Sequence, residues 1–409
     1  MRSRHFCLLK VKNVLKQRKI EDLLFECLQG ALWGHQLSFQ SLDHDSYQAL
    51  IDLARKQTVQ GLVGDALIRN EVQLERMDAI HLFSEMQTLA KENDRINQEL
   101  VQFVNALDRR SIEYIIVKGQ VMAALYPNPR ARVPGDVDMY FVGEHYFRAK
   151  KLVEEKLHVQ LEKFNDGKHV EFNVSRVTFE LHNQLSRFAL SKHQVYWNKI
   201  IDKCIEEGRA KVNINNRSIQ TLRGTYNVLF IFVHLFYHMT ASGLGLRQLC
   251  DFAIILSCCM MDEEEARQGV NHNSSWAIDK NELEKHLKAL GYWKAFNAVG
   301  ALVVDVLGLP ESRYPFQLKC KDRKWVRRIK RNVLKSGNFG RSRRKVKEIG
   351  LMHSLESGWL SVSQTMTYYQ LAPQEVLGRG MDLTSWFVER FKINWKRDEK
   401  LTRKTATGL

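Results

Sequence analysis

The chain has 409 residues, which is longer than one ordinary domain and predicts two to three compact units. Its hydrophobic fraction of 44% and charged fraction of 26% are typical of a folded, water-soluble protein. No uncharged apolar run reaches the roughly 18 residues of a membrane-spanning helix, which excludes such a helix.

The amino-terminal residues and the cysteines favour a cytoplasmic protein with reduced thiols. Arg and Lys interrupt the apolar positions of residues 1–19, and no small-residue cleavage site follows, so a secretory signal is not expected. The seven cysteines are scattered, odd in number and without CxxC spacing. They therefore predict neither a disulfide framework nor a zinc site.

The net charge of +16 is concentrated in one segment. Residues 319–347 hold fourteen Lys or Arg and a single acidic residue, and they supply 13 of the 16 excess charges. Such a patch can attract nucleic acid or an anionic membrane surface. The surroundings of Gly337 and Gly340 favour a loop here. Base stacking has little support, because Trp325 and Phe339 are the only aromatic residues of the segment.

The spacing of apolar residues predicts three regions along the chain. Helical spacing extends over residues 20–110, with a long amphipathic pattern from about 72 to 107. The next region predicts strands at 112–117, 137–142, 169–175 and 177–182, the last two as a hairpin, and a helix at 144–157. Beyond residue 220, helices are expected at 225–240, 246–261 and 280–306.

The predicted fold class is α+β, with a small mixed β-sheet flanked by helices and helical regions at both ends. The expected division is an N-terminal helical region at 1–110, an α+β core at 111–215, a helical domain at 216–310 and a basic, partly helical C-terminal region at 311–409.

Two aspartates stand at the start of the second expected strand. Because side chains alternate along a strand, Asp136, Asp138 and Tyr140 share one face, while Val137 and Met139 face a core. Carboxylates two residues apart on one face can bind hard divalent cations through their oxygen atoms. Without a cation between them, the two charges would repel each other. The pair predicts a metal site, and a solvated turn with two incidental aspartates is the alternative.

The end of the first expected strand suits phosphate binding. It stops at Lys118 and Gly119, and a helix from Gln120 to Leu125 follows at once. Glycine lets a phosphate approach the backbone, and the start of a helix offers free N–H groups. Lys118 adds a positive charge at the same place.

The strand at 177–182 carries a third carboxylate. By the same alternation, Glu180 shares one face with Thr178 and His182. A third carboxylate is what a two-metal phosphoryl-transfer centre requires. His182 either acts in this centre or is an ordinary hydrogen-bonded histidine, and both interpretations stay open.

These motifs together resemble a known family. The residues that carry the resemblance are Val117–Gly119, Leu125–Pro127, Arg130, Arg132, Gly135–Asp138 and Phe179–His182. They are similar to the uncharacterised bacterial nucleotidyltransferase family, a branch of the DNA polymerase β-like superfamily. The resemblance extends to residues 21–68 and 233–252, and it covers roughly residues 20 to 300.

The resemblance implies a sheet of nucleotidyltransferase type and a corresponding enzyme. Such an enzyme transfers a nucleoside monophosphate from a nucleoside triphosphate (NTP), bound with Mg²⁺ or Mn²⁺, to an acceptor hydroxyl. Asp136 and Asp138 would hold two metal ions, and Glu180 would complete the catalytic, metal-binding triad. Glu180 could also take the proton of the acceptor.

The same resemblance implies a set of nucleotide-binding residues. Lys118 and Gly119 would lie against the triphosphate. Arg130 or Arg132 would stabilise the leaving pyrophosphate, and His182 would lie with them in the nucleotide site.

Two departures from the superfamily pattern keep other hypotheses open. Gln120 follows the glycine, where Ser or Gly is usual, and the gap between Gly119 and Asp136 is longer than in many relatives. A non-catalytic, regulatory nucleotide-binding protein would tolerate both. A third hypothesis is a nucleic-acid-interacting protein that uses the basic segment 319–347. The acceptor, whether a small molecule, a sugar or a protein side chain, is not fixed by the scaffold.

Four polar residues beyond residue 230 allow two interpretations. His234 and His238 are one helical turn apart, which is a spacing of metal ligands. The apolar residues around them favour instead a buried polar network with Arg247 and Asp251. Such a network would join the helical part of the chain to the catalytic sheet, and an arginine near the cleft could contact the substrate.

Overall fold

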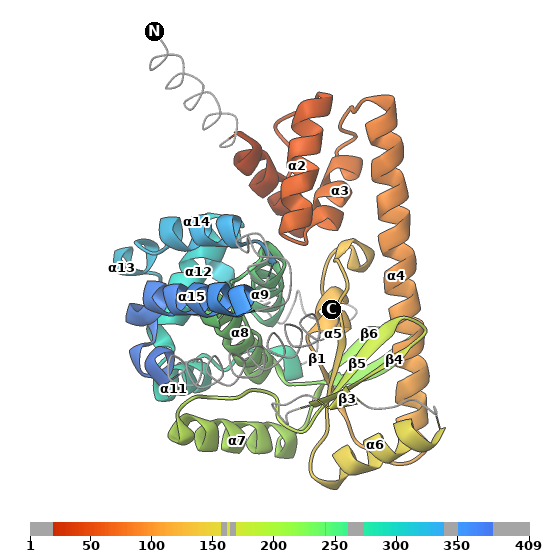
Figure 1. Ribbon diagram of the computed structural model, residues 1–409, viewed down its shortest axis with the longest axis vertical. Coiled ribbons are helices and arrows are strands. Elements are labelled where there is room, and N and C mark those ends of the chain that lie inside the picture. Colours follow the sequence, from red (N-terminus) through yellow and green to blue (C-terminus); the bar gives the residue numbers. More distant parts are fainter. Residues whose placement is uncertain are drawn as a thin grey trace, which may run out of the picture.

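Figure 1 shows the computed structural model, in which a small sheet lies between one long helix and a group of C-terminal helices. The structure describes residues 19–156, 162–163, 169–241, 243–260, 274–338 and 351–378. Helices and a small mixed sheet make the chain an α+β protein, as predicted.

The N-terminal part is helical. After a helix over residues 19–33 come α2 (His44–Lys56), α3 (Gln60–Arg69) and α4 (Arg76–Asp108). The side chain of Asp43 accepts a hydrogen bond from the backbone N–H of Ser46 and so caps the start of α2. Helix α4 runs from these helices along the side of the molecule to the sheet (Figure 1).

The larger sheet has five strands in the order β1-β2-β5-β4-β3. They are β1 (Ile115–Val117), β2 (Val137–Tyr140), β3 (Glu162–Lys163), β4 (His169–Val174) and β5 (Val177–His182). Strands β2 and β5 are parallel, and the other neighbouring strands are antiparallel. The four predicted strands, the hairpin of β4 and β5, and the helix α6 (Glu144–Lys156) are thus confirmed.

One face of this sheet is apolar and covered by α4. Phe103 of α4 meets the rings of Phe172 and Phe179 edge-on, with ring centroids 5.4 and 5.3 Å apart. Because residues alternate along each strand, Asp138 and its partner in register, Glu180, occupy the opposite face. The side of the sheet away from α4 is therefore the side that bears the carboxylates.

A helix and a second hairpin follow the sheet, and neither is predicted from the sequence. They are α7 (Ser191–Glu206) and the pair β6 (Ala210–Ile214) and β7 (Arg217–Thr221). The turn of the hairpin consists of Asn215 and Asn216, with φ of 47° and 60°. Asparagine tolerates this conformation better than most residues, so the Asn-Asn pair was the sequence signal for the turn. It lies at the boundary expected at residue 215.

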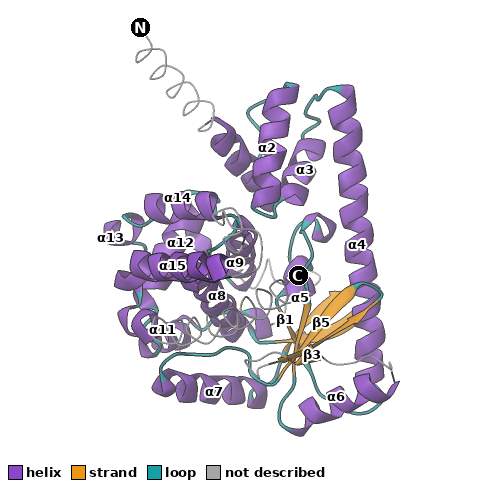
Figure 2. Ribbon diagram, in the orientation of Figure 1, coloured by secondary structure: helices purple, strands orange, loops and turns teal. Residues whose placement is uncertain are grey.

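The C-terminal helices pack around α8, which is apolar on nearly all sides and buried. The helices are α8 (Gly224–Ala241), α9 (Leu246–Cys259), α11 (Lys280–Ala289), α12 (Trp293–Asp305), α13 (Cys320–Arg323), α14 (Val326–Ser336) and α15 (Leu351–Tyr368). Shorter turns are α5 (Gly119–Ala123), η1 (Pro129–Ala131), η2 (Ser274–Trp276), η3 (Glu311–Arg313) and η5 (Tyr369–Leu371). Figure 2 shows these helices beside the strands. Within the described ranges, none of the helices combines the length and the apolar character needed to cross a membrane.

The basic segment is mostly helical up to Ser336, in α13 and α14, which agrees with the partly helical C-terminal region expected from the sequence and corrects the expectation of a loop for this part. Ile329 and Val333, one turn apart on α14, are buried. Gln57, at the end of α2, donates a hydrogen bond to the backbone oxygen of Val333. Gly337, with φ of 63°, follows the last residue of the helix. Residues 339–347 of the segment lie outside the described residues.

Candidate active site

The three predicted carboxylates converge at one end of the sheet. Asp136 directly precedes β2, Asp138 lies within it, and Glu180 stands beside Asp138 on β5. Their ligand oxygen atoms all lie within 4.8 Å of one another. Asp138 is buried, Glu180 is half-buried and Asp136 is exposed. This set of oxygen donors suits a hard divalent cation.

Lys118 and Gly119 form the turn from β1 to α5 beside these carboxylates. The Nζ atom of Lys118 is 2.7 Å from Oδ1 of Asp138. Gly119 has a φ of 39°, and a Cβ atom there would lie 2.9 Å from the backbone oxygen of Asp136. Only glycine combines this conformation with this close approach, so the turn packs directly against the start of β2.

The charges of the site shift one another's pKa. The negative charge of Asp138, followed by partial desolvation of the carboxyl group, raises the pKa of Asp136 to about 7. Burial raises the pKa of Asp138, but Lys118 and the hydrogen bond from His182 outweigh it and hold that pKa below its ordinary value. Burial lowers the pKa of Lys118, whereas attraction by Asp138 and Asp136 brings it above its ordinary value. At neutral pH, the carboxyl group of Asp136 is therefore partly protonated.

His182 lies between the two inner carboxylates. Its Nε2 atom is 3.0 Å from Oδ1 of Asp138 and 3.1 Å from Oε2 of Glu180. Burial lowers the pKa of His182, but the hydrogen bonds to both carboxylates raise it further than burial lowers it. Burial likewise raises the pKa of Glu180, and the hydrogen bond with His182 helps to bring it below its ordinary value. The structure thus places His182 in direct contact with the carboxylates.

His169 joins a second group that the sequence analysis did not identify. It stands opposite His182 in the hairpin register, with ring centroids 5.1 Å apart. Ligand atoms of His169, Glu180 and His182 also lie within 4.8 Å of one another. The sequence held a signal for His169: when the two predicted strands are paired as a hairpin about the turn at 175–176, His169 lies opposite His182.

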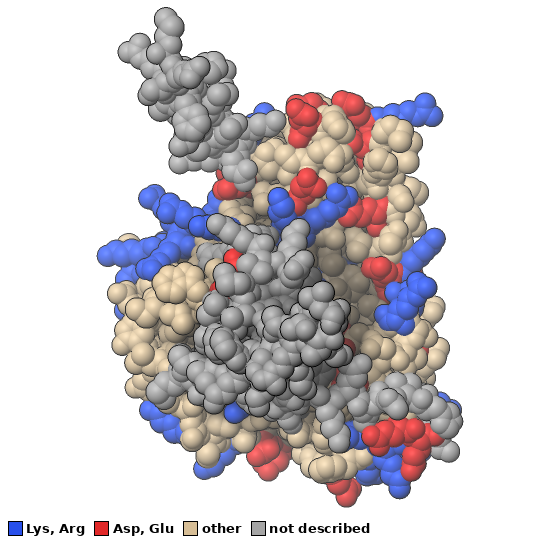
Figure 3. All heavy atoms as spheres, viewed as in Figure 1, with Lys and Arg blue, Asp and Glu red and all other residues tan. Residues whose placement is uncertain are grey.

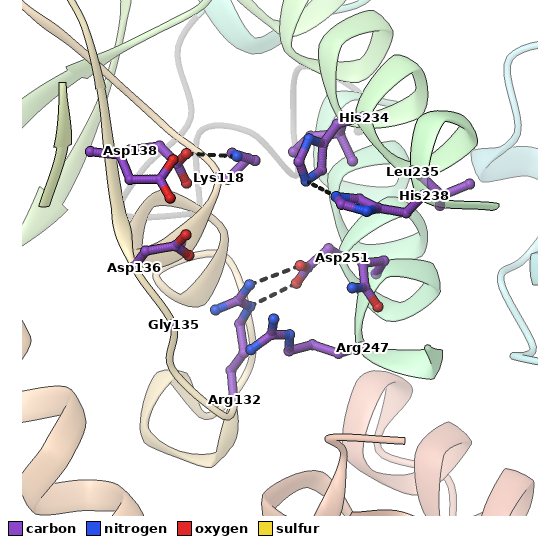
Figure 4. Close-up of a pocket in the computed structure, with 14 residues that line it drawn as sticks. Lys118, Arg132, Gly135, Asp136, Asp138, His234, Leu235, His238, Arg247 and Asp251 are labelled. Atoms are coloured by element: carbon purple, nitrogen blue, oxygen red, sulfur yellow. Dashed lines mark hydrogen bonds and ion pairs between the residues drawn. The ribbon is translucent and has the colours of Figure 1, made fainter. Parts of the chain in front are cut away.

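A pocket of about 240 Å³ opens beside the carboxylates, between the sheet and helices α8 and α9 (Figure 4). The sheet side contributes Lys118, Gly119, Asp136, Asp138 and Glu180, and the helix side contributes His234, His238, Arg247 and Gln248. The volume is below the range of about 300–1,000 Å³ of pockets that enclose drug-sized ligands. A nucleotide seated here would therefore extend beyond the pocket.

A buried network joins the loop before β2 to α9, as one interpretation of the sequence predicts. Arg132 donates to both carboxylate oxygens of Asp251, from Nε at 2.7 Å and from Nη2 at 2.9 Å. The hydroxyl of Tyr126 donates to Oδ1 of Asp251 at 2.8 Å. Arg247 donates from Nη1 to the backbone oxygens of residues 133–134, at 3.2 and 3.1 Å. These bonds confirm the network for Arg247 and Asp251.

The histidines of α8 form a pair on the helix side of the pocket. Their Nε2 atoms are 3.1 Å apart. Burial, followed by the charge of Lys118, lowers the pKa of His234 well below its ordinary value, so this ring is neutral at pH 7. Neither His234 nor His238 belongs to a group of three metal ligands within the described part of the chain.

Two other residues singled out from the sequence point away from the pocket. Arg130 forms an exposed ion pair with Asp94 of α4, with Nη2 and Oδ2 2.7 Å apart. The amide of Gln120 donates to Oδ1 of Asn97, also on α4, at 2.6 Å. Gln120 therefore leaves the pocket unchanged, and of the two arginines expected at the pyrophosphate only Arg132 lines the pocket.

Comparison with known proteins connects this site to a family. A family model described as an uncharacterised nucleotidyltransferase matches residues 43–271. The chain belongs to this family. The matched stretch contains both walls of the pocket, from Lys118 to Asp251. It confirms the central part of the resemblance that the sequence motifs indicate.

One solved structure and the curated proteins complete the comparison. The chain is similar to an antigenic nucleotidyltransferase-like protein from Paracoccidioides brasiliensis, with 14% sequence identity and a TM-score of 0.31. That similarity covers 54% of this chain and 92% of the other. The comparison with curated proteins gave no match.

Proposed function

We propose that this member of the nucleotidyltransferase family transfers a nucleoside monophosphate from an NTP to an acceptor hydroxyl and releases pyrophosphate. The observation that carries the proposal is the convergence of Asp136, Asp138 and Glu180 beside Lys118 in one pocket. Three carboxylates this close repel one another unless cations lie between them, and the raised pKa of Asp136 reflects that repulsion. A site whose ligands are all carboxylate oxygens suits Mg²⁺ or Mn²⁺.

The carboxylates would hold the metal ions and assist the reaction. Asp136, Asp138 and Glu180 are the ligands, and the bound ions would neutralise charge that develops on the phosphates. The acceptor oxygen attacks the α-phosphorus, the bond from that phosphorus to the bridging oxygen breaks, and its electron pair leaves with pyrophosphate. Glu180, whose pKa lies below its ordinary value, is ionised at neutral pH and accepts the proton of the acceptor.

The surrounding residues would bind the nucleotide and orient the carboxylates. Lys118 binds the triphosphate, and Gly119 lets it approach the backbone. Helix α5 has only five residues, so this contact depends on the turn itself. His182 holds Asp138 and Glu180 in place through its two contacts. Arg132 contributes positive charge from the pocket wall.

Calorimetric titration with each Mg²⁺-NTP tests the proposal. We expect binding heat for the native chain and none for the double variant Asp136→Ala/Asp138→Ala. The control, Asp45→Ala/Asp52→Ala, removes two exposed carboxylates of α2 and should bind as the native chain does. The transferase proposal fails if the native chain binds no NTP with either Mg²⁺ or Mn²⁺.

Turnover and acceptor class need a separate measurement. Incubation with an NTP labelled on the α-phosphate, together with sugars, small hydroxyl compounds or the protein alone, reports the acceptor by where the label goes. Pyrophosphate release that depends on Asp136 and Asp138 supports catalysis. Metal-dependent binding without release would support the non-catalytic, regulatory alternative instead.

Nucleic acid is a second candidate partner, favoured by the outer surface of α13 and α14. Figure 3 shows Lys and Arg side chains gathered over these helices. The exposed cations are Lys319, Lys321, Lys324, Arg327, Arg328, Arg331 and Lys335. Contacts of this kind with phosphates weaken steeply between about 50 and 200 mM salt. We expect salt-dependent binding of RNA or DNA by the native chain and its loss in the triple variant Arg327→Gln/Arg328→Gln/Arg331→Gln. Equal binding by the native chain and the triple variant would reject this function.

A further inference from the structure

Three cations line the pocket, and they differ in how their charge is compensated. Lys118 pairs with Asp138, and Arg132 forms a two-point ion pair with Asp251. Arg247 forms no ion pair with any carboxylate in the part of the chain that the structure describes. It is the one described cation of the pocket whose charge has no carboxylate in contact.

The guanidinium of Arg247 is only partly satisfied. Its Nη1 atom donates to the backbone oxygens of residues 133–134, whereas its buried Nε atom has no hydrogen-bond partner. Burial, followed by the charge of Arg132, lowers the pKa of Arg247. A partly buried cation beside a second cation costs free energy unless an anion approaches it. A negatively charged ligand in the pocket would compensate this charge and accept a hydrogen bond from Nε.

The position of Arg247 indicates where that ligand lies. In Figure 4 its side chain extends from α9 toward the loop of Gly135, next to Arg132 and across the pocket from the aspartates. A Cβ atom at Gly135 would lie 3.6 Å from Nη1 of Arg247, so a side chain at this position would cover the guanidinium. Glycine at this position leaves the guanidinium uncovered on that side.

We propose that Arg247 binds the terminal phosphate groups of the nucleotide, which leave as pyrophosphate. This inference rests on the proposed nucleotidyl transfer. A guanidinium presents planar N–H donors that match phosphate oxygens, and it keeps its charge at any physiological pH. The sequence motifs suggest Arg130 and Arg132 for this role. Arg130 is ion-paired with Asp94, and Arg132 is ion-paired with Asp251. Arg247 is recruited from α9, more than a hundred residues further along the chain.

Calorimetry on the full chain tests the inference with inorganic triphosphate, the four NTPs and the four nucleoside monophosphates. In Arg247→Gln we expect triphosphate and NTP affinity to fall about 10- to 100-fold, because charge-assisted hydrogen bonds to the terminal phosphates are lost. Monophosphate affinity should stay within about twofold. Arg55→Gln, which removes an exposed arginine of α2, is the control and should bind all probes as the native chain does.

Each outcome decides between the inference and the transferase proposal. NTP binding that depends on metal but is unchanged in Arg247→Gln rejects the inference and leaves the transferase proposal standing. Arg247-dependent binding of inorganic triphosphate in EDTA, without metal-dependent NTP binding, keeps the anion site and rejects the transferase. Absence of all binding rejects both.

If Arg247→Gln does not fold, Arg247→Lys decides, because it keeps the charge and loses the planar donors. Weakened triphosphate binding with unchanged monophosphate binding then supports the inference, and any other result overturns it.

Discussion

At the scale of single residues, the site gathers groups that oppose the stability of the metal-free protein. Asp136 and Asp138 lie on one face of the same strand, and the nearest cation, Lys118, contacts only Asp138 among them. Asp136 is left with a pKa of about 7, because the neighbouring charge disfavours its ionised form. The proposed role of Asp136 as a metal ligand therefore conflicts with the stability of the metal-free protein, a conflict that is common at functional sites.

Replacing Asp136 by Asn should stabilise the metal-free protein while it removes a proposed metal ligand. The folded-state pKa of about 7 exceeds the ordinary value of 3.8, so the loss of stability grows from about pH 4 to pH 7 and is fully present above pH 7. Asp136 is exposed and solvent screens the repulsion, so we expect a gain of about 1 kcal/mol near pH 8. Near pH 3 the carboxyl is protonated in both states and the gain should vanish. Urea denaturation in EDTA at both pH values measures the free energy of unfolding. If Asp136→Asn is less stable than the native chain near pH 8, the repulsion at Asp136 does not destabilise the folded state.

Gly119→Ala should destabilise the protein and disturb the turn that precedes α5. The positive φ costs a residue with a Cβ atom roughly 1 kcal/mol, and the contact with the backbone oxygen of Asp136 adds to that. We expect a total loss of about 2–3 kcal/mol in the free energy of unfolding. Gly291→Ala is the matched control, because φ is 71° and no atom lies within 4 Å of the added Cβ. If Gly119→Ala and Gly291→Ala lose the same free energy of unfolding, the close approach at Gly119 does not contribute to the loss.

At the scale of elements, one buried ion pair holds α9 to the loop before β2. Asp251→Ala removes the partner of buried Arg132, and we expect a loss of about 3–5 kcal/mol because a charge is left unpaired in the interior. Asp94→Ala breaks the exposed pair with Arg130 and should cost less than about 1 kcal/mol. Chemical denaturation of both variants measures the difference. Similar losses would mean that Arg132 finds another partner when Asp251 is absent.

Helix α14 was not predicted as a helix, because its many charged residues favour a loop. Its lysines and arginines predict a solvated loop, yet Ile329 and Val333 repeat at helical spacing and are buried. The charges then occupy the outer face, as in any amphipathic helix. Counting apolar positions four residues apart, rather than charge density, would have identified the helix.

At the scale of the whole molecule, the pocket lies between parts of the chain that fold against one continuous core. Buried apolar residues from Ile20 to Val376 form a single cluster, and the pocket walls come from both the sheet and α8–α9. A ligand that bridges these walls adds its binding free energy to the stability of the folded state.

Mg²⁺-NTP should therefore raise the melting temperature of the native chain. At a ligand concentration 100 times the Kd, the stabilisation is about 2.7 kcal/mol. Differential scanning calorimetry should show a rise that grows with the logarithm of ligand concentration. The double variant Asp136→Ala/Asp138→Ala serves as the control, and a rise of the same size in that variant would place the nucleotide elsewhere.

The sequence by itself determined the parts of the site that depend on local pattern. Alternation within each strand placed Asp136 with Asp138 on one face of β2 and Glu180 with His182 on one face of β5. The parallel pairing of the two strands, which sets Asp138 beside Glu180, came from the fold. Lys118 and Gly119 were recognisable because a strand ends there. The motifs around them indicated the family that the chain belongs to.

Only the tertiary structure decided which distant side chains face the pocket. Arg132 and Asp251 are separated by 119 positions, and no periodicity within either segment reports their contact. Arg130 and Gln120 turn to α4 because acceptors there, on Asp94 and Asn97, satisfy their donors. Arg247 enters the pocket because α9 packs against the loop before β2. The direction of a polar side chain depends on the partners that long-range packing brings within hydrogen-bond distance, and local sequence does not encode those partners.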